Sequence, residues 1–134
     1  MTHQNETLIR SYYAAFNAKR FDEMLSLLHD SVIHDTNQGT RSIGKEAFKK
    51  FLGEMNAFYD ERLDDIHVML DSSGLRAAAE FVCHGIYKTS AEGLPAARGQ
   101  KYTLPVGCFF EIKDSKIARV TNYYNLEDWL SQVK

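Results

Sequence analysis

The run His34-Asp35-Thr36-Asn37-Gln38-Gly39 carries five polar side chains that are well suited to chemistry, followed by a glycine. They follow the apolar pair Val32-Ile33, so the run begins where a buried strand would end. Burying a polar group without a partner costs about 1–3 kcal/mol, so such groups are hydrogen-bonded or wet. A small domain that gathers His, Asp, Asn and Gln at one strand end therefore predicts a ligand site there.

His34 and Asp35 are the two candidate proton acceptors in this run. Adjacent residues of a regular strand point to opposite faces, so both can face one site only if a bulge intervenes. If His34 faces inward, its imidazole is the candidate base, because the pKa of histidine lies near physiological pH. Asn37 or Asn122 would then orient the substrate. The alternative is that His34 is a hydrogen-bonded core residue and Asp35 a structural acceptor, and the sequence leaves both open.

The composition limits which partners such a site can have. The 134 residues carry a formal net charge of −2 and are 44% hydrophobic, which favours one packed domain over residues 1–134. A chain with this net charge is not expected to bind nucleic acid or an anionic membrane, both of which need a basic surface. With a polar N-terminus and no apolar run of membrane-spanning length, the protein is expected in the cytoplasm. Cys83 and Cys108 are expected as free thiols, although neighbouring strands would also allow a disulfide between them.

Helical periodicity dominates the first half of the chain. Apolar residues recur at i, i+4 and i+8 over residues 5–18, which predicts a first amphipathic helix. A short helix is expected from Phe21, a short strand over Val32 to His34, and a third helix over about residues 45–61. Met55 and Tyr59 would lie on the apolar face of that third helix.

The second half changes to the alternation typical of strands. Strands are expected over residues 66–70, 76–88, 102–112 and 117–124, followed by a helix over residues 126–133 that Asn125 caps. Helices first and a meandering antiparallel sheet second is an α+β pattern. A bent sheet wrapped around helices would enclose an apolar cone, the usual kind of small-molecule site.

Several short motifs, in this order, resemble a cone-shaped family that includes nuclear transport factor 2, the ketosteroid isomerases and the SnoaL-type polyketide cyclases. The motifs are Tyr12–Asn17, Leu27–Val32, Gly44–Phe48, Leu104–Phe110 and Lys116–Val120. The resemblance covers nearly the whole chain. It implies an α+β cone in which N-terminal helices pack on a strongly curved antiparallel sheet.

The resemblance to ketosteroid isomerases implies roles for single residues. Those enzymes use an aspartate base, with a tyrosine and a protonated aspartic acid as the oxyanion hole. The tyrosine falls on Tyr12, and the adjacent Tyr13 competes for that role. The base falls on Thr36 in a gapless match and on Asp35 after a shift of one residue. The second acid falls on Cys108, whose thiol is a weak donor.

We therefore predict a cofactor-free enzyme of isomerase or cyclase type that transfers a proton on a small apolar carbonyl compound. His34 or Asp35 would be the base, and Tyr12 and Asn122 would donate to the developing enolate oxygen. In the resemblance to SnoaL-type cyclases, Asn122 falls on their acid and Tyr87 lies near their pocket histidine. The residues expected to contact the ligand are Phe16, Asn37, Met55, Tyr59, Tyr87, Cys108, Phe110 and Tyr124.

A second hypothesis is a protein of the same fold that binds a similar ligand without chemistry. It is favoured by Thr36, Cys108 and Asn122, which stand where the resemblance places carboxylic acids. No metal or other cofactor is expected, because no ligand spacing on one element supports a metal site. A homodimer through the outer face of the sheet is expected, because Phe109 would otherwise be exposed there.

Overall fold

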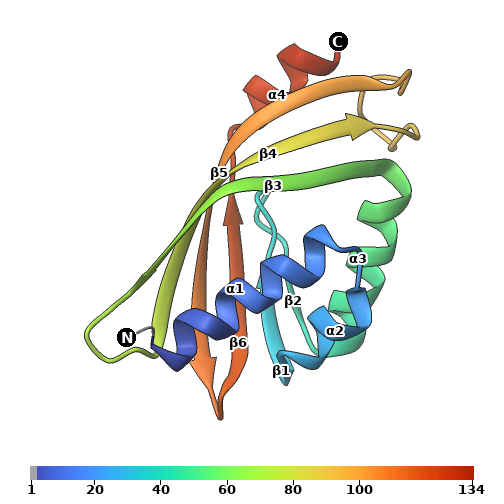
Figure 1. Ribbon diagram of the computed structural model, residues 1–134. Coiled ribbons are helices and arrows are strands. Elements are labelled where there is room, and N and C mark those ends of the chain that lie inside the picture. Colours follow the sequence, from blue (N-terminus) through green and yellow to red (C-terminus); the bar gives the residue numbers. More distant parts are fainter. Residues whose placement is uncertain (1–2) are drawn as a thin grey trace.

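The computed structural model describes residues 3–134 and shows helices packed in the hollow of a strongly curved sheet (Figure 1). The helices are α1 (Gln4–Asn17), α2 (Phe21–Ser26), α3 (Lys45–Phe58) and α4 (Leu126–Val133). The strands are β1 (Leu28–Asp35), β2 (Arg41–Ile43), β3 (Tyr59–Leu70), β4 (Arg76–Tyr87), β5 (Gln100–Lys113) and β6 (Lys116–Tyr123). The predicted α+β class, with N-terminal helices on a curved sheet, is confirmed.

The strands form one sheet in the order β2-β1-β6-β5-β4-β3. Neighbouring strands are antiparallel except β1 and β6, which are parallel and far apart in the sequence. The parallel pair arises because the chain crosses through α3 and the β3–β5 meander before β6 returns beside β1. The short strand β2 was not predicted, because three residues are too few to show a period.

Helix α3 ends three residues earlier than the sequence pattern predicts. Tyr59 is already extended, with φ −131° and ψ 146°, and it pairs with Tyr87 across β3 and β4. Pairing with β4 therefore overrides the apolar helical spacing of residues 55–61. Strand β3 therefore begins at Tyr59, and Glu61 is its third residue, paired with Gly85 of β4.

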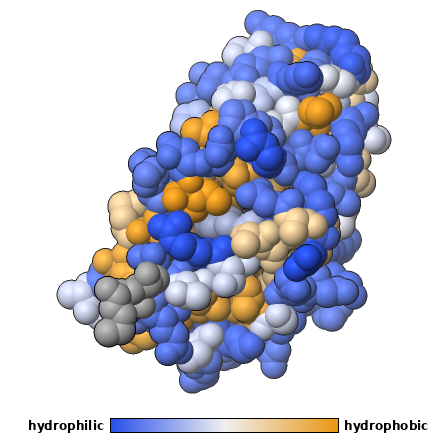
Figure 2. Space-filling view, viewed as in Figure 1, coloured by the Kyte–Doolittle hydropathy of each residue, from blue (hydrophilic) through white to orange (hydrophobic). Residues whose placement is uncertain are grey.

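The core fills the space between the concave face of the sheet and the helices. Strand β4 alternates strictly, with Ala77, Ala79, Phe81 and Cys83 buried on the inner side. Helix α1 lies across this face, and Asn17 at its end bonds the backbone of Leu63 in both directions, at 2.9 and 2.8 Å. Hydrophilic residues cover most of the face that carries α1, with apolar residues showing in patches (Figure 2). Across residues 3–134 no helix is long and apolar enough to cross a membrane.

Candidate functional site

A cavity of about 380 Å³ opens into the hollow of the sheet. Its wall is built by the three N-terminal helices, inward residues of β1, β3, β4, β5 and β6, the segment after β1, and α4. Most lining side chains are aromatic or aliphatic. A second hollow of about 350 Å³ near Asp65 and Pro105 is more open. The larger cavity is the candidate site, because enclosed apolar cavities with few polar groups are typical of ligand sites.

The cavity brings together most of the residues that the sequence singled out. Those found in its lining are Tyr12, Phe16, His34, Asn37, Met55, Tyr59, Asn122 and Tyr124. Thr36, where the isomerase base falls in a gapless match, also lies in the lining. Four predicted residues, Asp35, Tyr87, Cys108 and Phe110, lie outside it.

His34 is a buried titratable group of the cavity wall. It is 2% exposed, and its ring centroid lies 4.5 Å from those of both Phe48 and Phe51. Burial lowers the pKa of His34 to about 4, against a smaller opposing effect of the Asp35 charge. Because a charged imidazole is poorly solvated between aromatic rings, His34 is neutral at pH 7.

Asn122 and Cys108 orient the His34 ring. The Cys108 thiol donates to Asn122 Oδ1 at 2.7 Å, so the amide nitrogen of Asn122 faces His34 Nε2 at 3.4 Å. In this arrangement Nε2 accepts and the imidazole proton lies on Nδ1. Nδ1 is buried and has no hydrogen-bond partner among residues 3–134. The chain Cys108–Asn122–His34 thus holds a neutral imidazole with its Nε2 lone pair directed at an amide.

Tyr12 and Tyr13 contribute hydroxyl groups from α1. Burial is the main reason why the pKa of each lies well above its usual value, with the nearby Cys108 adding to the effect. Both therefore stay protonated and able to donate. The Tyr13 hydroxyl is buried next to the Cys108 sulfur, which is a weak acceptor, and it makes no hydrogen bond of normal geometry among residues 3–134. The sequence favoured Tyr12, and the structure places both tyrosines in the cavity wall, 5.2 Å apart between ring centroids.

Asp35 lies on the outer face of the sheet, as strict alternation after His34 requires. Arg41 donates to its two carboxylate oxygens at 2.6 and 3.0 Å, and Thr121 donates at 2.8 Å. These contacts, the Arg41 hydrogen bond first, lower the pKa of Asp35 to about 2. The register irregularity of β1 lies between residues 28 and 33, not beside Asp35. The structure therefore does not bring Asp35 to the cavity.

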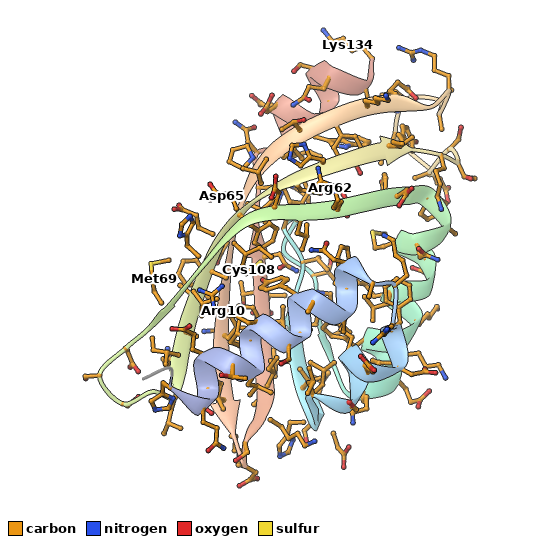
Figure 3. The ribbon with its side chains drawn as sticks, in the orientation of Figure 1. Arg10, Arg62, Asp65, Met69, Cys108 and Lys134 are labelled. Carbon is orange, nitrogen blue, oxygen red and sulfur yellow. The ribbon has the colours of Figure 1, made fainter. Side chains whose placement is uncertain are left out.

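Tyr87, Cys108 and Phe110 support the cavity from behind its wall. The Tyr87 hydroxyl donates to Pro95 O at 2.7 Å and accepts from Ala91 N at 2.8 Å, which holds the β4–β5 loop. Phe110 is 1% exposed and packs against Tyr12. Cys108 lies on the sheet behind α1 (Figure 3), and burial raises the pKa of its thiol to about 12. Cys83 and Cys108 are both free thiols.

Sequence reasoning missed a second polar place in the cavity wall. Glu61 lines the cavity, and the Tyr102 hydroxyl donates to its carboxylate at 2.7 Å. The sequence pattern places Glu61 at the end of a helix, and a helical position does not predict that its side chain points into the cavity from a strand. The signal that could have found the pair is the inward alternation of Tyr102, Leu104 and Val106 on β5.

Comparison with known proteins assigns the chain to a family. The model of the SnoaL-like domain matches residues 9–120. The chain belongs to the SnoaL-like family. A search of curated proteins finds no match.

Several solved structures superpose on the chain. One from Pseudomonas putida KT2440, described as a "putative polyketide cyclase", is 54% identical over 100% of both chains, with a TM-score of 0.95. A protein from Xanthomonas campestris pv. campestris with the same description is 50% identical, over 98% of this chain and 97% of that one, also with a TM-score of 0.95. An epoxide hydrolase of M. tuberculosis, 17% identical over 97% of this chain and 84% of that one, shares the fold alone, at a TM-score of 0.77.

Proposed function

We propose that this SnoaL-like protein transfers a proton on a small apolar carbonyl compound, as an isomerase or a cyclase does. The observation that carries the proposal is a neutral, buried histidine in the wall of an apolar cavity that also holds a buried tyrosine hydroxyl without a hydrogen-bond partner. Buried polar groups without partners are rare in folded proteins. A ligand carbonyl oxygen would supply the acceptor that Tyr13 lacks.

His34 is the proposed base. Its pKa of about 4 keeps it unprotonated across physiological pH, so its Nε2 lone pair is available to take a proton from the carbon beside the carbonyl. Ketosteroid isomerases enolise their substrates with an aspartate whose pKa is about 4.6. A histidine with a pKa near 4 therefore has about the basicity of that carboxylate.

Asn122, Tyr12 and Tyr13 are the proposed partners of His34. The 3.4 Å contact from the Asn122 amide is long, so a substrate C–H can displace it from Nε2. The tyrosine hydroxyls would donate to the oxygen as the negative charge of the enolate develops there, which is where preorganised donors lower the barrier. Phe16, Met55 and the other apolar lining residues would hold the hydrocarbon part of the ligand.

The test is exchange of α-protons in deuterated water, followed by NMR with a panel of enolisable ketones that runs from 1-tetralone to 2-acetylfluorene. We expect catalysed exchange, and a fall of about 100-fold or more in His34→Gln, the range typical for loss of a general base. Asp35→Asn serves as the matched control and should change the rate less than about threefold, since Asp35 faces away from the cavity.

The same experiment separates the two hypotheses drawn from the sequence. Tight binding of a panel ketone with no catalysed exchange would contradict the proposed proton transfer and favour a protein that only binds its ligand. That alternative draws support from Cys108 and Asn122, which hold His34 in place where related enzymes carry acids. Equal loss of exchange in His34→Gln and Asp35→Asn would contradict the assignment of the base.

A further inference from the structure

The Glu61–Tyr102 pair gives the cavity a second polar place that the proposed proton transfer does not use. Tyr102 is 3% exposed, and its hydroxyl donates to Glu61 Oε2 at 2.7 Å. Both side chains belong to the cavity lining. A carboxylate in a mostly apolar wall is costly to bury without partners, so its presence there needs an explanation.

The sheet is shaped to bring this pair together. Glu61 on β3 lies opposite Gly85 on β4, and Gly85 lies opposite Tyr102 on β5. A Cβ atom at Gly85 would lie 2.2 Å from Cζ of Tyr102. The Tyr102 ring therefore crosses β4 over the bare glycine backbone, which lets its hydroxyl reach a carboxylate two strands away.

The groups around Glu61 are weak acids that keep their protons. Burial is the main cause that raises the pKa of Tyr102 and of Cys83, and the Glu61 charge is the next. Burial is the main cause that raises the pKa of Tyr59 to about 12, and its acidic neighbours Tyr124, Tyr87 and Glu61 add to the effect. The side chains of Tyr59, Cys83 and Tyr102 beside the Glu61 carboxylate are therefore neutral at pH 7. Its two oxygens offer about four acceptor sites, so it can accept further hydrogen bonds besides the one from Tyr102.

The two polar places lie at different ends of the cavity. On β5 the inward residues run in the order Tyr102, Leu104, Val106 and Cys108. Tyr102 donates to Glu61, and Cys108, behind the cavity wall, donates to Asn122, whose amide faces His34. Residues 102 and 108 are about 20 Å apart along a strand. The apolar side chains of Leu104 and Val106 lie between them, so an apolar stretch separates the two polar places of the cavity.

We infer that the Glu61 end of the cavity binds a hydroxyl group of the ligand. The ligand would then be an elongated apolar carbonyl compound with a hydroxyl at the end opposite its carbonyl. This inference rests on the proposed function for the carbonyl end. A neutral donor fits better than a cation, because the Lys19 ammonium already lies 2.9 Å from the Glu61 carbonyl oxygen and 3.4 Å from Asp60.

Matched derivatives of one ketone test the hydroxyl site. We would measure dissociation constants of 2-acetylfluorene carrying hydrogen, hydroxyl or aminomethyl at position 7, by calorimetry on the full chain. A hydrogen bond to a charged acceptor predicts that the hydroxyl compound binds about tenfold more tightly than the hydrogen compound. In Glu61→Gln this preference should fall to about threefold or less, while the affinity for the hydrogen compound stays within about threefold. Glu54→Gln, an exposed change on α3, should leave both affinities unchanged.

Each outcome decides one part of the inference. Equal affinities of the hydrogen and hydroxyl compounds for the unmodified protein would overturn the hydroxyl site and leave the proposed function standing. Tighter binding of the aminomethyl compound than of the hydroxyl compound would also overturn it, in favour of a cation site. If no panel ketone binds, the proposed function fails and the hydroxyl site fails with it. Tyr102→Phe, which keeps the Glu61 charge, should retain the preference for the hydroxyl compound.

Discussion

At the scale of single residues, the burial of His34 links chemistry to stability. The pKa of His34 is about 4 in the folded protein and 6.5 for an ordinary histidine. The unfolded chain therefore binds a proton at higher pH than the folded protein does. Stability is unaffected above about pH 7 and falls as the pH drops from 6.5 towards 4, by about 3 kcal/mol in total.

This pH dependence is our first prediction. The free energy of unfolding in urea, measured at pH 7, 5.5 and 4.5, should fall in the unmodified protein and fall by about 2 kcal/mol less in His34→Gln. Asp35 does not affect this measurement. Its pKa is lowered from 3.8 to about 2 in the folded protein, so the stability that it contributes is lost only as the pH falls below about 4. The same pH slope in both proteins would mean that His34 is not buried in a neutral form.

A second prediction concerns the Tyr13 hydroxyl, which is buried without a partner among residues 3–134. Tyr13→Phe removes the unsatisfied group and keeps the ring, so the free protein should become more stable by about 1 kcal/mol. The same change should lower the affinity for panel ketones by about tenfold. Urea unfolding and calorimetry measure the two effects, with the exposed Tyr123→Phe as control. A loss of stability in Tyr13→Phe would show that the hydroxyl has a partner in solution.

At the scale of elements, Gly85 is the position in β4 that permits the Glu61–Tyr102 contact. Gly85→Ala would place Cβ inside the Tyr102 ring, and that ring is confined by Tyr59 and Trp129, at centroid distances of 6.4 and 5.9 Å. We predict a loss of stability of about 1–3 kcal/mol, the usual effect of overpacking.

Gly53→Ala is the matched control for that prediction. Gly53 lies inside α3, and a Cβ there meets nothing within 4 Å. The substitution should stabilise the protein by about 0.5–1 kcal/mol, because alanine is the better helix former. Thermal unfolding of both variants measures the contrast. An equal effect of the two substitutions would show that the Tyr102 ring moves away at no cost.

At the scale of the whole molecule, the convex face of the sheet leaves apolar rings exposed. Phe109 and Tyr123 are 45% and 56% exposed, and their ring centroids lie 5.8 Å apart. Charged side chains cross the sheet beside them, with Glu111 paired to both Arg76 and Arg119. An apolar patch with a charged border is typical of an interface, and a pair of identical faces closes with twofold symmetry.

We predict that two copies associate through this face. Sedimentation over a range of concentrations should show a dimer, and Phe109→Lys should weaken its association by about tenfold or more. Leu75→Lys is the control, because Leu75 is 54% exposed at the turn between β3 and β4. A monomer at all concentrations, or equal effects of the two lysine variants, would contradict this interface.

The sequence alone determined what depends on local spacing. Apolar periods of three to four residues predicted α1 and α3, and the long runs from Arg76 and from Tyr102 predicted β4 and β5. Alternation also required His34 and Asp35 to face opposite sides, although it left open which of them faced the cavity. These inferences hold because side-chain direction repeats with the period of the element.

Only the tertiary structure decided what depends on contacts between distant segments. Pairing with β4 converted residues 59–61 from expected helix to strand and turned Glu61 into the cavity. The register across three strands then set Glu61, Gly85 and Tyr102 side by side. The cluster of polar residues after Val32 contributed His34 to the cavity, while Arg41 and Thr121 hold Asp35 on the outer face. Such choices rest on pairing energies between residues far apart in the chain, which no local pattern records.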